Sequence, residues 1–194
     1  MKISYIFLAK GFEEIEAITP IDVLRRAGMN VKTVSITDSR EVVGAHGTPI
    51  KADMLFTDCV FDPADTEWLI LPGGMPGAEN LHKFEPLNRL LLEHAANGGK
   101  IAAICASPAV VLSPLGILDG HEATCYPGFE KLCHKEVKMR DQRVVALEKI
   151  ITANGPSSAL HFSLAIVANS MGESVSQEVG SGMLFYTRST SMFF

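Results

Sequence analysis

The chain has 194 residues, of which 47% are hydrophobic and 20% are charged, a size and composition typical of one folded domain. Its formal net charge of -5 disfavours nucleic acid as a partner, and no apolar run reaches the ~20 residues that a membrane span needs. The short apolar N-terminus leads directly into charged residues, unlike a secretion signal. We therefore expect one cytoplasmic domain over residues 1–194, with its cysteines mostly reduced.

The first part of the chain predicts a β-α-β unit. Residues 3–9 and 31–36 are apolar enough for buried strands, and residues 13–27 between them have helical periodicity. A right-handed crossover makes the two strands parallel. Pro20 lies inside the helix and predicts a kink or a break. The expected inner side of this helix carries Ile15, Ile18, Val23 and Leu24.

The middle of the chain predicts a glycine-turned hairpin over residues 42–50, a buried strand over 68–71 and a helix over 81–97. Residues 101–105 predict another buried strand, after which Ser107-Pro108 opens a helix. Cys105 then lies at a strand-to-helix turn comparable to the nucleophile elbow of hydrolases. Free backbone N–H groups and the helix dipole lower the pKa of a cysteine there. The alternative is an ordinary buried cysteine.

The last part predicts two strands, 144–147 and 150–153, a helix through Met171 and a final helix over 174–184. The tail from Thr187 shows no period. Helices and short apolar strands alternate throughout the chain. This alternation favours an α/β fold with an open, mostly parallel sheet and helices on both faces.

Sites in such sheets form at the carboxyl ends of strands, where we expect the loops 10–16, 72–77 and 105–108 to meet. The backbone of Gly73-Gly74 could form an oxyanion pocket with the amide of Ala106, or simply a tight turn.

Three glutamates begin the first helix, Glu13, Glu14 and Glu16, and complementarity to the helix dipole explains most of them. A glutamate that reached Cys105 would oppose the thiolate when ionised, but could donate a hydrogen bond to it when protonated. A useful partner would therefore be buried, with a raised pKa.

Four motifs occur in order along the chain: Ala9-Lys-Gly-Phe-Glu-Glu-Ile-Glu16, Leu71-Pro-Gly-Gly74, Ala102-Ala-Ile-Cys-Ala106 and Asn154-Gly-Pro156. Together they resemble the ThiJ/PfpI superfamily, in the branch of the parkinsonism-associated protein DJ-one. The resemblance implies a flavodoxin-like three-layer sandwich, of the class I glutamine amidotransferase-like kind, and a homodimer. It implies that Cys105 is the reactive cysteine and that Glu16 is the buried glutamate bonded to its sulfur. Gly73, Gly74 and Ala106 match the oxyanion pocket of the family.

One position departs from the family pattern. Tyr126 stands where many members carry a histidine before proline, and a tyrosine hydroxyl is a poor general base at neutral pH. Tyr126 could still position a substrate. His46 lies in a stretch similar to one in bacterial relatives, so it either approaches the pocket or only shapes a turn.

Metal chemistry is a weaker alternative. The possible zinc ligands His121, Cys125, Cys133 and His134 are close in sequence, but their spacing fits no usual pattern. We therefore expect no metal and no cofactor, and we expect Cys59 and Cys133 to be packing residues.

These observations lead to one main hypothesis and two alternatives. The main hypothesis is an enzyme of the glyoxalase or deglycase type that acts on small α-oxoaldehydes or their adducts. Cys105 would be its nucleophile, Glu16 would transfer protons and Tyr126 would position the substrate. The first alternative is a redox sensor or stress-responsive chaperone that uses oxidation of Cys105. The second is a cysteine peptidase or amidase, which the missing histidine weakens.

Overall fold

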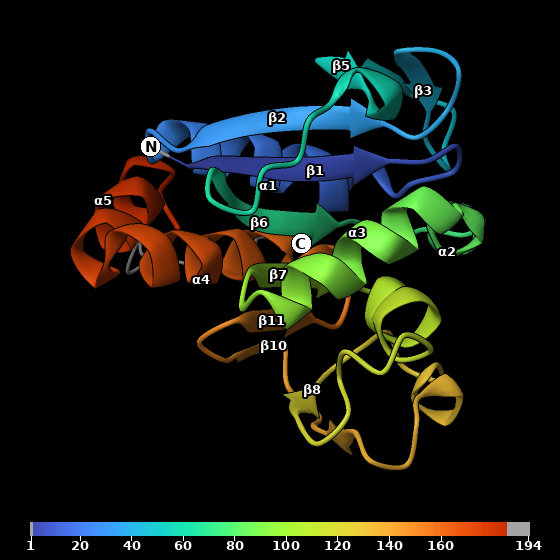
Figure 1. The fold of residues 1–194 in the computed structure, drawn as a ribbon. Coiled ribbons are helices and arrows are strands. Elements are labelled where there is room, and N and C mark those ends of the chain that lie inside the picture. The colour runs from blue at the N-terminus through green and yellow to red at the C-terminus, as the bar shows by residue number, and fades with distance from the viewer. Residues whose placement is uncertain (1, 186–194) are drawn as a thin grey trace.

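The computed structural model describes residues 2–185, so the tail from Thr187 lies outside the described residues. A seven-stranded sheet in the order β10-β11-β7-β6-β1-β2-β5 forms its centre (Figure 1). The strands of this sheet are β1 (Ile3–Leu8), β2 (Asn30–Ser35), β5 (Met54–Leu55), β6 (Thr66–Leu71), β7 (Lys100–Ile104), β10 (Val144–Ala146) and β11 (Ile150–Ala153). Every neighbouring pair is parallel except β10 with β11. The predicted, mostly parallel sheet is therefore confirmed.

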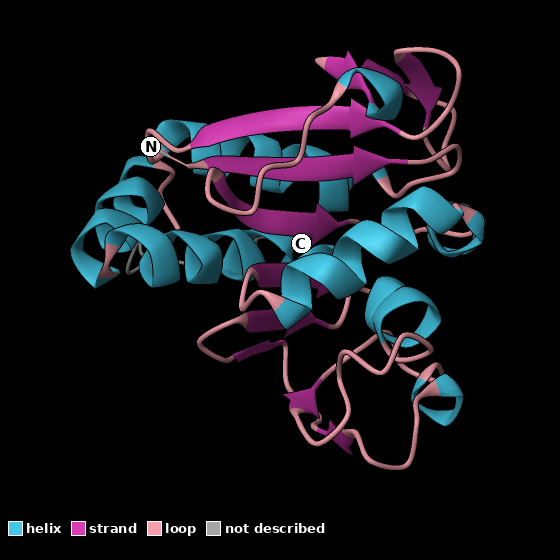
Figure 2. Cartoon of the chain, in the orientation of Figure 1, coloured by secondary structure: helices cyan, strands magenta, loops and turns pink. Residues whose placement is uncertain are grey.

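Helices cover both faces of the sheet, as Figure 2 shows. They are α1 (Glu14–Arg26), α2 (Gly77–Lys83), α3 (Glu85–Ala96), α4 (Ala159–Met171) and α5 (Glu173–Gly182). Because side chains alternate along a strand, Ile6 and Leu8 of β1 enter the core beneath α1 and α4, whereas Tyr5 and Phe7 enter the core beneath α3. The result is a flavodoxin-like three-layer α/β sandwich. No described helix is long and apolar enough to cross a membrane.

Two helix predictions need correction. The helix expected over 81–97 is two helices, α2 and α3, that meet at Phe84. Pro86 has no N–H to give to the carbonyl of His82, and the Asn88 side chain donates to that carbonyl at 2.7 Å instead. In α1, by contrast, the helix continues through Pro20 without a break.

The inner side of α1 also differs from the prediction. Val23 and Leu24 are fully buried, but Ile15 and Ile18 are 54% and 45% exposed. Glu16 is buried on the inner side in their place. The polar contacts of Glu16, described below, outweigh the apolar pattern at this end of the helix.

Two small sheets flank the central one. The predicted hairpin forms from β3 (Glu41–Val43) and β4 (Pro49–Lys51), which pair in antiparallel fashion. Strands β8 (Glu122–Ala123) and β9 (Lys138–Met139) pair in a segment that is otherwise mostly turns and loops (Figure 2).

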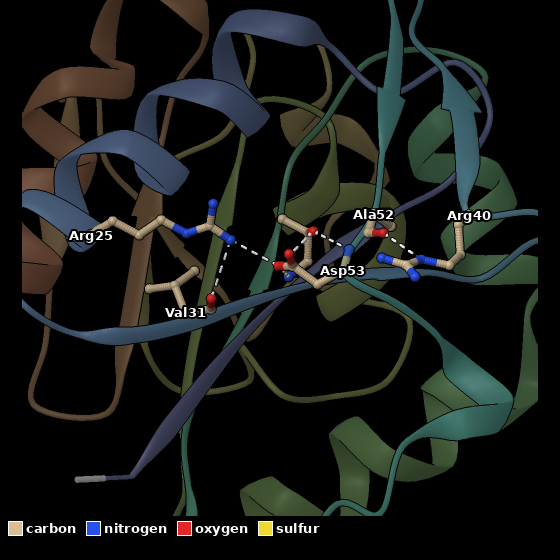
Figure 3. Close-up of polar contacts among 6 residues, drawn as sticks. Arg25, Val31, Arg40, Ala52 and Asp53 are labelled. Atoms are coloured by element: carbon tan, nitrogen blue, oxygen red, sulfur yellow. Dashed lines mark hydrogen bonds and ion pairs between the residues drawn. The ribbon is translucent and has the colours of Figure 1, made fainter.

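Asp53 joins the segment after the hairpin to the main body (Figure 3). Its Oδ2 accepts hydrogen bonds from Arg25 Nη2 of α1 at 2.8 Å, and from Thr33 N and Oγ1 of β2 at 2.8 and 3.0 Å. Nearby, Arg40 Nε donates to the carbonyl of Ala52 at 2.8 Å. These contacts fix the hairpin beside the carboxyl ends of β1 and β2.

Candidate active site

The three loops expected at one edge of the sheet do meet there, chiefly through backbone hydrogen bonds. The N–H of Glu13 donates to the carbonyl of Gly73 at 3.0 Å, and the N–H of Gly77 donates to the carbonyl of Gly11 at 3.1 Å. The Ser107 hydroxyl donates to the carbonyl of Pro72 at 2.6 Å. The hairpin closes the other side, because Phe12 accepts from Ala45 N–H at 2.7 Å and Gly11 N–H donates to Val43 at 2.8 Å.

Cys105 occupies the turn directly after β7. Its φ of 65° lies in the left-handed region, which non-glycine residues rarely adopt. The backbone is held on both sides: its N–H donates to Ala153 O and its carbonyl accepts from Tyr126 N–H, each at 2.8 Å. The side chain is buried, with 8% of the residue exposed. The next helical segment, Pro108–Leu112, is one short π-helical turn, so its dipole is small.

Glu16 supplies a fully buried carboxyl group next to the Cys105 thiol. Its Oε2 accepts the N–H of Gly73 at 2.8 Å. Its Oε1 is buried without a hydrogen-bond partner of standard geometry among residues 2–185. The Cys105 side chain and the charge of Glu13 also interact with this carboxyl. Burial raises the pKa of Glu16 to about 7, the direction that a proton-sharing partner of Cys105 requires.

The expectation of an acidified Cys105 is wrong for this environment. Burial and the neighbouring Glu16 carboxylate raise the pKa of Cys105 to about 12, although the N–H groups of Gly74 and Ala106 oppose this rise. The carboxylate and the thiolate each disfavour the other, so the pair carries at most one negative charge near neutral pH. A thiolate at Cys105 therefore requires the proton to be on Glu16.

The oxyanion pocket also differs in one member from the prediction. The N–H of Gly73 is used by Glu16, so it does not face the sulfur. A Cβ at Gly73 would lie 2.7 Å from Cys105 Cβ and 2.8 Å from Glu16 Oε2, which explains the glycine by close packing. The amides of Gly74 and Ala106 are the two that hydrogen-bond to the sulfur. Gly74 has a φ of 86°, a conformation that glycine adopts without strain.

The two aromatic candidates have different positions. Tyr126 lies next to Cys105 through the backbone hydrogen bond already described, and its side chain is partly exposed and packs edge-on against Phe129. His46 is bound to Glu14 instead: its Nδ1 and its backbone N–H each contact the Glu14 carboxylate, at 2.8 and 2.7 Å. This hydrogen bond raises the pKa of His46. The structure thus supports the turn-shaping role of His46.

The glutamates that begin α1 have three separate roles that the sequence did not distinguish. Glu13 Oε2 accepts the N–H of Glu16 at 2.8 Å and caps the helix. Glu14 holds the hairpin turn and Glu16 faces Cys105. Because Glu13 bonds to a backbone N–H, which every residue except proline carries, the residue type at position 16 gives no signal of this contact in the sequence.

The four possible zinc ligands do not gather in the described part of the chain. Cys125 and Cys133 contact each other, but His134 Nδ1 hydrogen-bonds to Asp119 at 3.0 Å. Glu13, Glu14 and His46 do come together, but the Glu14 oxygens are already bound to His46 and Glu13 caps the helix.

Comparisons with known proteins agree on one group. The model of the DJ-1/PfpI family matches residues 2–169. The Drosophila melanogaster protein dj-1beta is 34% identical over 184 residues, covering 94% of this chain and 97% of the relative. A Caenorhabditis elegans protein named glutathione-independent glyoxalase DJR-1.2 is 36% identical over 156 residues, covering 80% of this chain and 81% of the relative.

Relatives of other lengths and solved structures extend this likeness. Protein DJ-1 homolog B of Arabidopsis thaliana is 38% identical over 176 residues, which cover 89% of this chain but 39% of the relative, so the chain spans less than half of that protein. The structure of oxidized Toxoplasma gondii DJ-1 superposes with a TM-score of 0.90 at 36% identity, over 96% of this chain and 100% of that one.

Proposed function

Because this chain belongs to the DJ-1/PfpI family, we propose that it is a cysteine-dependent enzyme acting on small α-oxoaldehydes or their adducts, of the glyoxalase or deglycase type. The observation that carries the proposal is the buried Glu16 carboxyl beside Cys105. The relative named as a glutathione-independent glyoxalase supports the class of substrate.

The reaction begins when the Cys105 thiolate adds to the aldehyde carbon, while Glu16 holds the proton. As the carbon–sulfur bond forms, the electron pair of the C=O bond moves to oxygen and the sulfur loses its charge. The N–H groups of Gly74 and Ala106, which stabilised the thiolate, are then free to stabilise the oxyanion. The same two amides thus serve both charged states.

Glu16 then transfers protons. A carboxyl group with a pKa of about 7 can both release and accept a proton at neutral pH, which is the best match for a general acid and base. Its position is fixed by the N–H of Gly73. Tyr126, partly exposed next to Cys105, would position the substrate.

The direct test measures loss of methylglyoxal with two variants and one control. Cys105→Ser should reduce turnover to background, and Glu16→Gln should reduce kcat/KM by roughly 10²–10⁴-fold, the usual contribution of general acid–base catalysis. Cys59→Ser, whose half-buried thiol bonds to Leu55 O away from the site, is the matched control. Unchanged turnover in Cys105→Ser would refute the mechanism.

A second candidate function is redox sensing through oxidation of Cys105. It is favoured by the likeness to a solved structure that is named as oxidized, and by the Gly74 and Ala106 amides, which could bind oxygen atoms added to the sulfur. Mild hydrogen peroxide followed by mass spectrometry should show oxygen added first at Cys105. Oxygen uptake at Cys59 before Cys105 would exclude the sensor role.

The expected homodimer is likewise a proposal. Ile15 and Ile18 expose apolar surface on α1, which a second copy would cover. Sedimentation of the wild type should then give twice the chain mass, and Ile15→Asp with Ile18→Asp should give the single mass. A monomeric wild type at micromolar concentration would contradict this.

A further inference from the structure

A pocket of about 300 Å³ opens where β7 and β11 begin, at the edge of the sheet opposite to Cys105. Three segments line it: the end of α3, the loop over residues 116–121 and the tight turn between β10 and β11. Because β7 runs from this pocket to the turn that holds Cys105, the strand separates Ile101 from Cys105 by about 13 Å. The proposed reaction therefore does not use this pocket.

The lining of the pocket is mainly apolar. Ile101 and Ile150 belong to the core beneath α3 and are 1% and 9% exposed. Ile117 and Leu147 pack against the same core but stay partly exposed. Ligand sites commonly combine a lining of this kind with a few polar groups, and a volume near the lower end of their range suits a small molecule.

Hydrogen bonds fix the turn that forms one wall. Asn169 Nδ2 of α4 donates to the carbonyls of Leu147 and Glu148 at 3.3 and 3.0 Å. The carbonyl of Lys149 accepts the N–H of Ile101 at 2.9 Å. This wall is therefore in place before a ligand arrives, which lowers the entropic cost of binding.

The same turn brings two opposite charges to the pocket. Glu148 and Lys149 both line it, and both are exposed. Neither side chain forms an ion pair or a hydrogen bond with another part of residues 2–185. The carboxylate of Glu148 and the ammonium group of Lys149 are thus both available to a ligand.

This pair of charges selects the kind of ligand. A simple carboxylate would be repelled by Glu148, and a simple amine would be repelled by Lys149. A zwitterion with an apolar chain avoids both penalties and also covers the apolar lining.

We propose that this pocket binds a free α-amino acid with a large apolar or aromatic side chain. Its carboxylate pairs with Lys149, its ammonium group pairs with Glu148, and its side chain packs against Ile117 and Leu147. The proposal is independent of the function proposed for Cys105.

The experiment titrates the full chain with four probes by isothermal titration calorimetry. The probes are L-phenylalanine, 3-phenylpropionate without the ammonium group, 2-phenylethylamine without the carboxylate, and glycine without the side chain. We expect L-phenylalanine to bind about three- to fivefold more tightly than either single-charge probe, the usual worth of one exposed ion pair, and glycine not to bind measurably. No saturable binding of L-phenylalanine at roughly millimolar concentration would overturn the proposal. Equal affinity for L-phenylalanine and any other probe would overturn it too.

Two charge variants locate the site. In Lys149→Gln, L-phenylalanine and 2-phenylethylamine should bind equally, and in Glu148→Gln, L-phenylalanine and 3-phenylpropionate should bind equally. Both substitutions fall on an exposed turn, so neither should disturb folding. Lys51→Gln and Glu41→Gln, which are exposed on the hairpin β3–β4, are the matched controls and should keep the wild-type preference. Cys105→Ser should also bind like the wild type, so this proposal and the proposed function can fail separately. If both charge variants keep the wild-type preference, the amino acid binds elsewhere and the proposal is overturned.

Discussion

Gly73 is the position at which the site tolerates the least change. In Gly73→Ala the added methyl carbon would lie 2.7 Å from Cys105 Cβ, 2.8 Å from Glu16 Oε2 and 2.9 Å from the carbonyl of Ile104. Two of these neighbours cannot rotate away, because one is a Cβ atom and the other belongs to the backbone of β7. The displacement therefore falls on the Glu16 carboxyl and on the loop that carries Gly73.

The size of this effect follows from the crowding. Overpacking by one methyl group costs about 1–3 kcal/mol, and each kcal/mol lowers Tm by about 2–4 °C for a chain of this size. A misplacement of about 1 Å at the reacting groups lowers turnover by roughly 10²-fold. Thermal melts and methylglyoxal assays should therefore show a moderate loss of Tm and a much larger relative loss of kcat/KM.

The matched control is Gly182→Ala. A Cβ at Gly182 in α5 would have no heavy atom within 4 Å, and alanine is the better helix former there. This variant should keep wild-type turnover with equal or slightly higher Tm. Wild-type turnover and Tm in Gly73→Ala would refute the close packing of Glu16 and Cys105 around this glycine.

Three further predictions concern charge. Burial raises the pKa of Glu16 in the folded state from 4.5 to about 7. The contribution of Glu16 to the free energy of unfolding is therefore complete below pH 4.5 and is lost as the pH rises to about 7. Urea unfolding should show this loss, of up to about 3 kcal/mol, in the wild type but not in Glu16→Gln. Burial would raise the pKa of Asp53, but the hydrogen bonds from Thr33 and the charge of Arg25 outweigh it and lower this pKa. The contribution of Asp53 to the free energy of unfolding is therefore present above pH 3.8 and is lost as the pH falls through the lowered pKa of the folded state. Asp53→Asn should lower the free energy of unfolding by about 0.5–1 kcal/mol at pH 7, a modest value because the Arg25–Asp53 pair is partly exposed. Equal stability of the variant and the wild type at pH 7 would contradict a stabilising role of the Asp53 contacts. His46→Ala should leave kcat/KM nearly unchanged, and a large loss would restore a catalytic role for His46.

The sequence was informative wherever the physical requirement is local. Short apolar strands separated by helical patterns are sufficient to predict a mostly parallel sheet, and hence the edge at which Glu16 and Cys105 meet. The exposure of Ile15 could not be predicted in this way, because it depends on which partners Glu14 and Glu16 find in distant segments. The same holds for Gly73, since the direction of its N–H is fixed by a carboxyl group on α1.

The pKa of Cys105 shows the same limit. Its place at the end of β7 was predictable, but the degree of burial and the distance to a carboxyl group arise only from tertiary packing. The break at Phe84 was only partly visible in the sequence, because Pro86 marks it, but Pro20, to which the same rule applies, lies inside the unbroken helix α1.

Backbone hydrogen bonds hold the loop around Gly11 between the hairpin β3–β4 and the loop around Gly77. These bonds join backbone N–H and carbonyl groups, so they do not involve the side chains of Phe12 and Met75. Met75, which is 42% exposed, can therefore change without disturbing these hydrogen bonds, whereas Phe12 is fully buried in the core and is constrained by packing. If the chain is the proposed enzyme, its activity should be a late reporter of refolding, since the site needs all of these segments docked together.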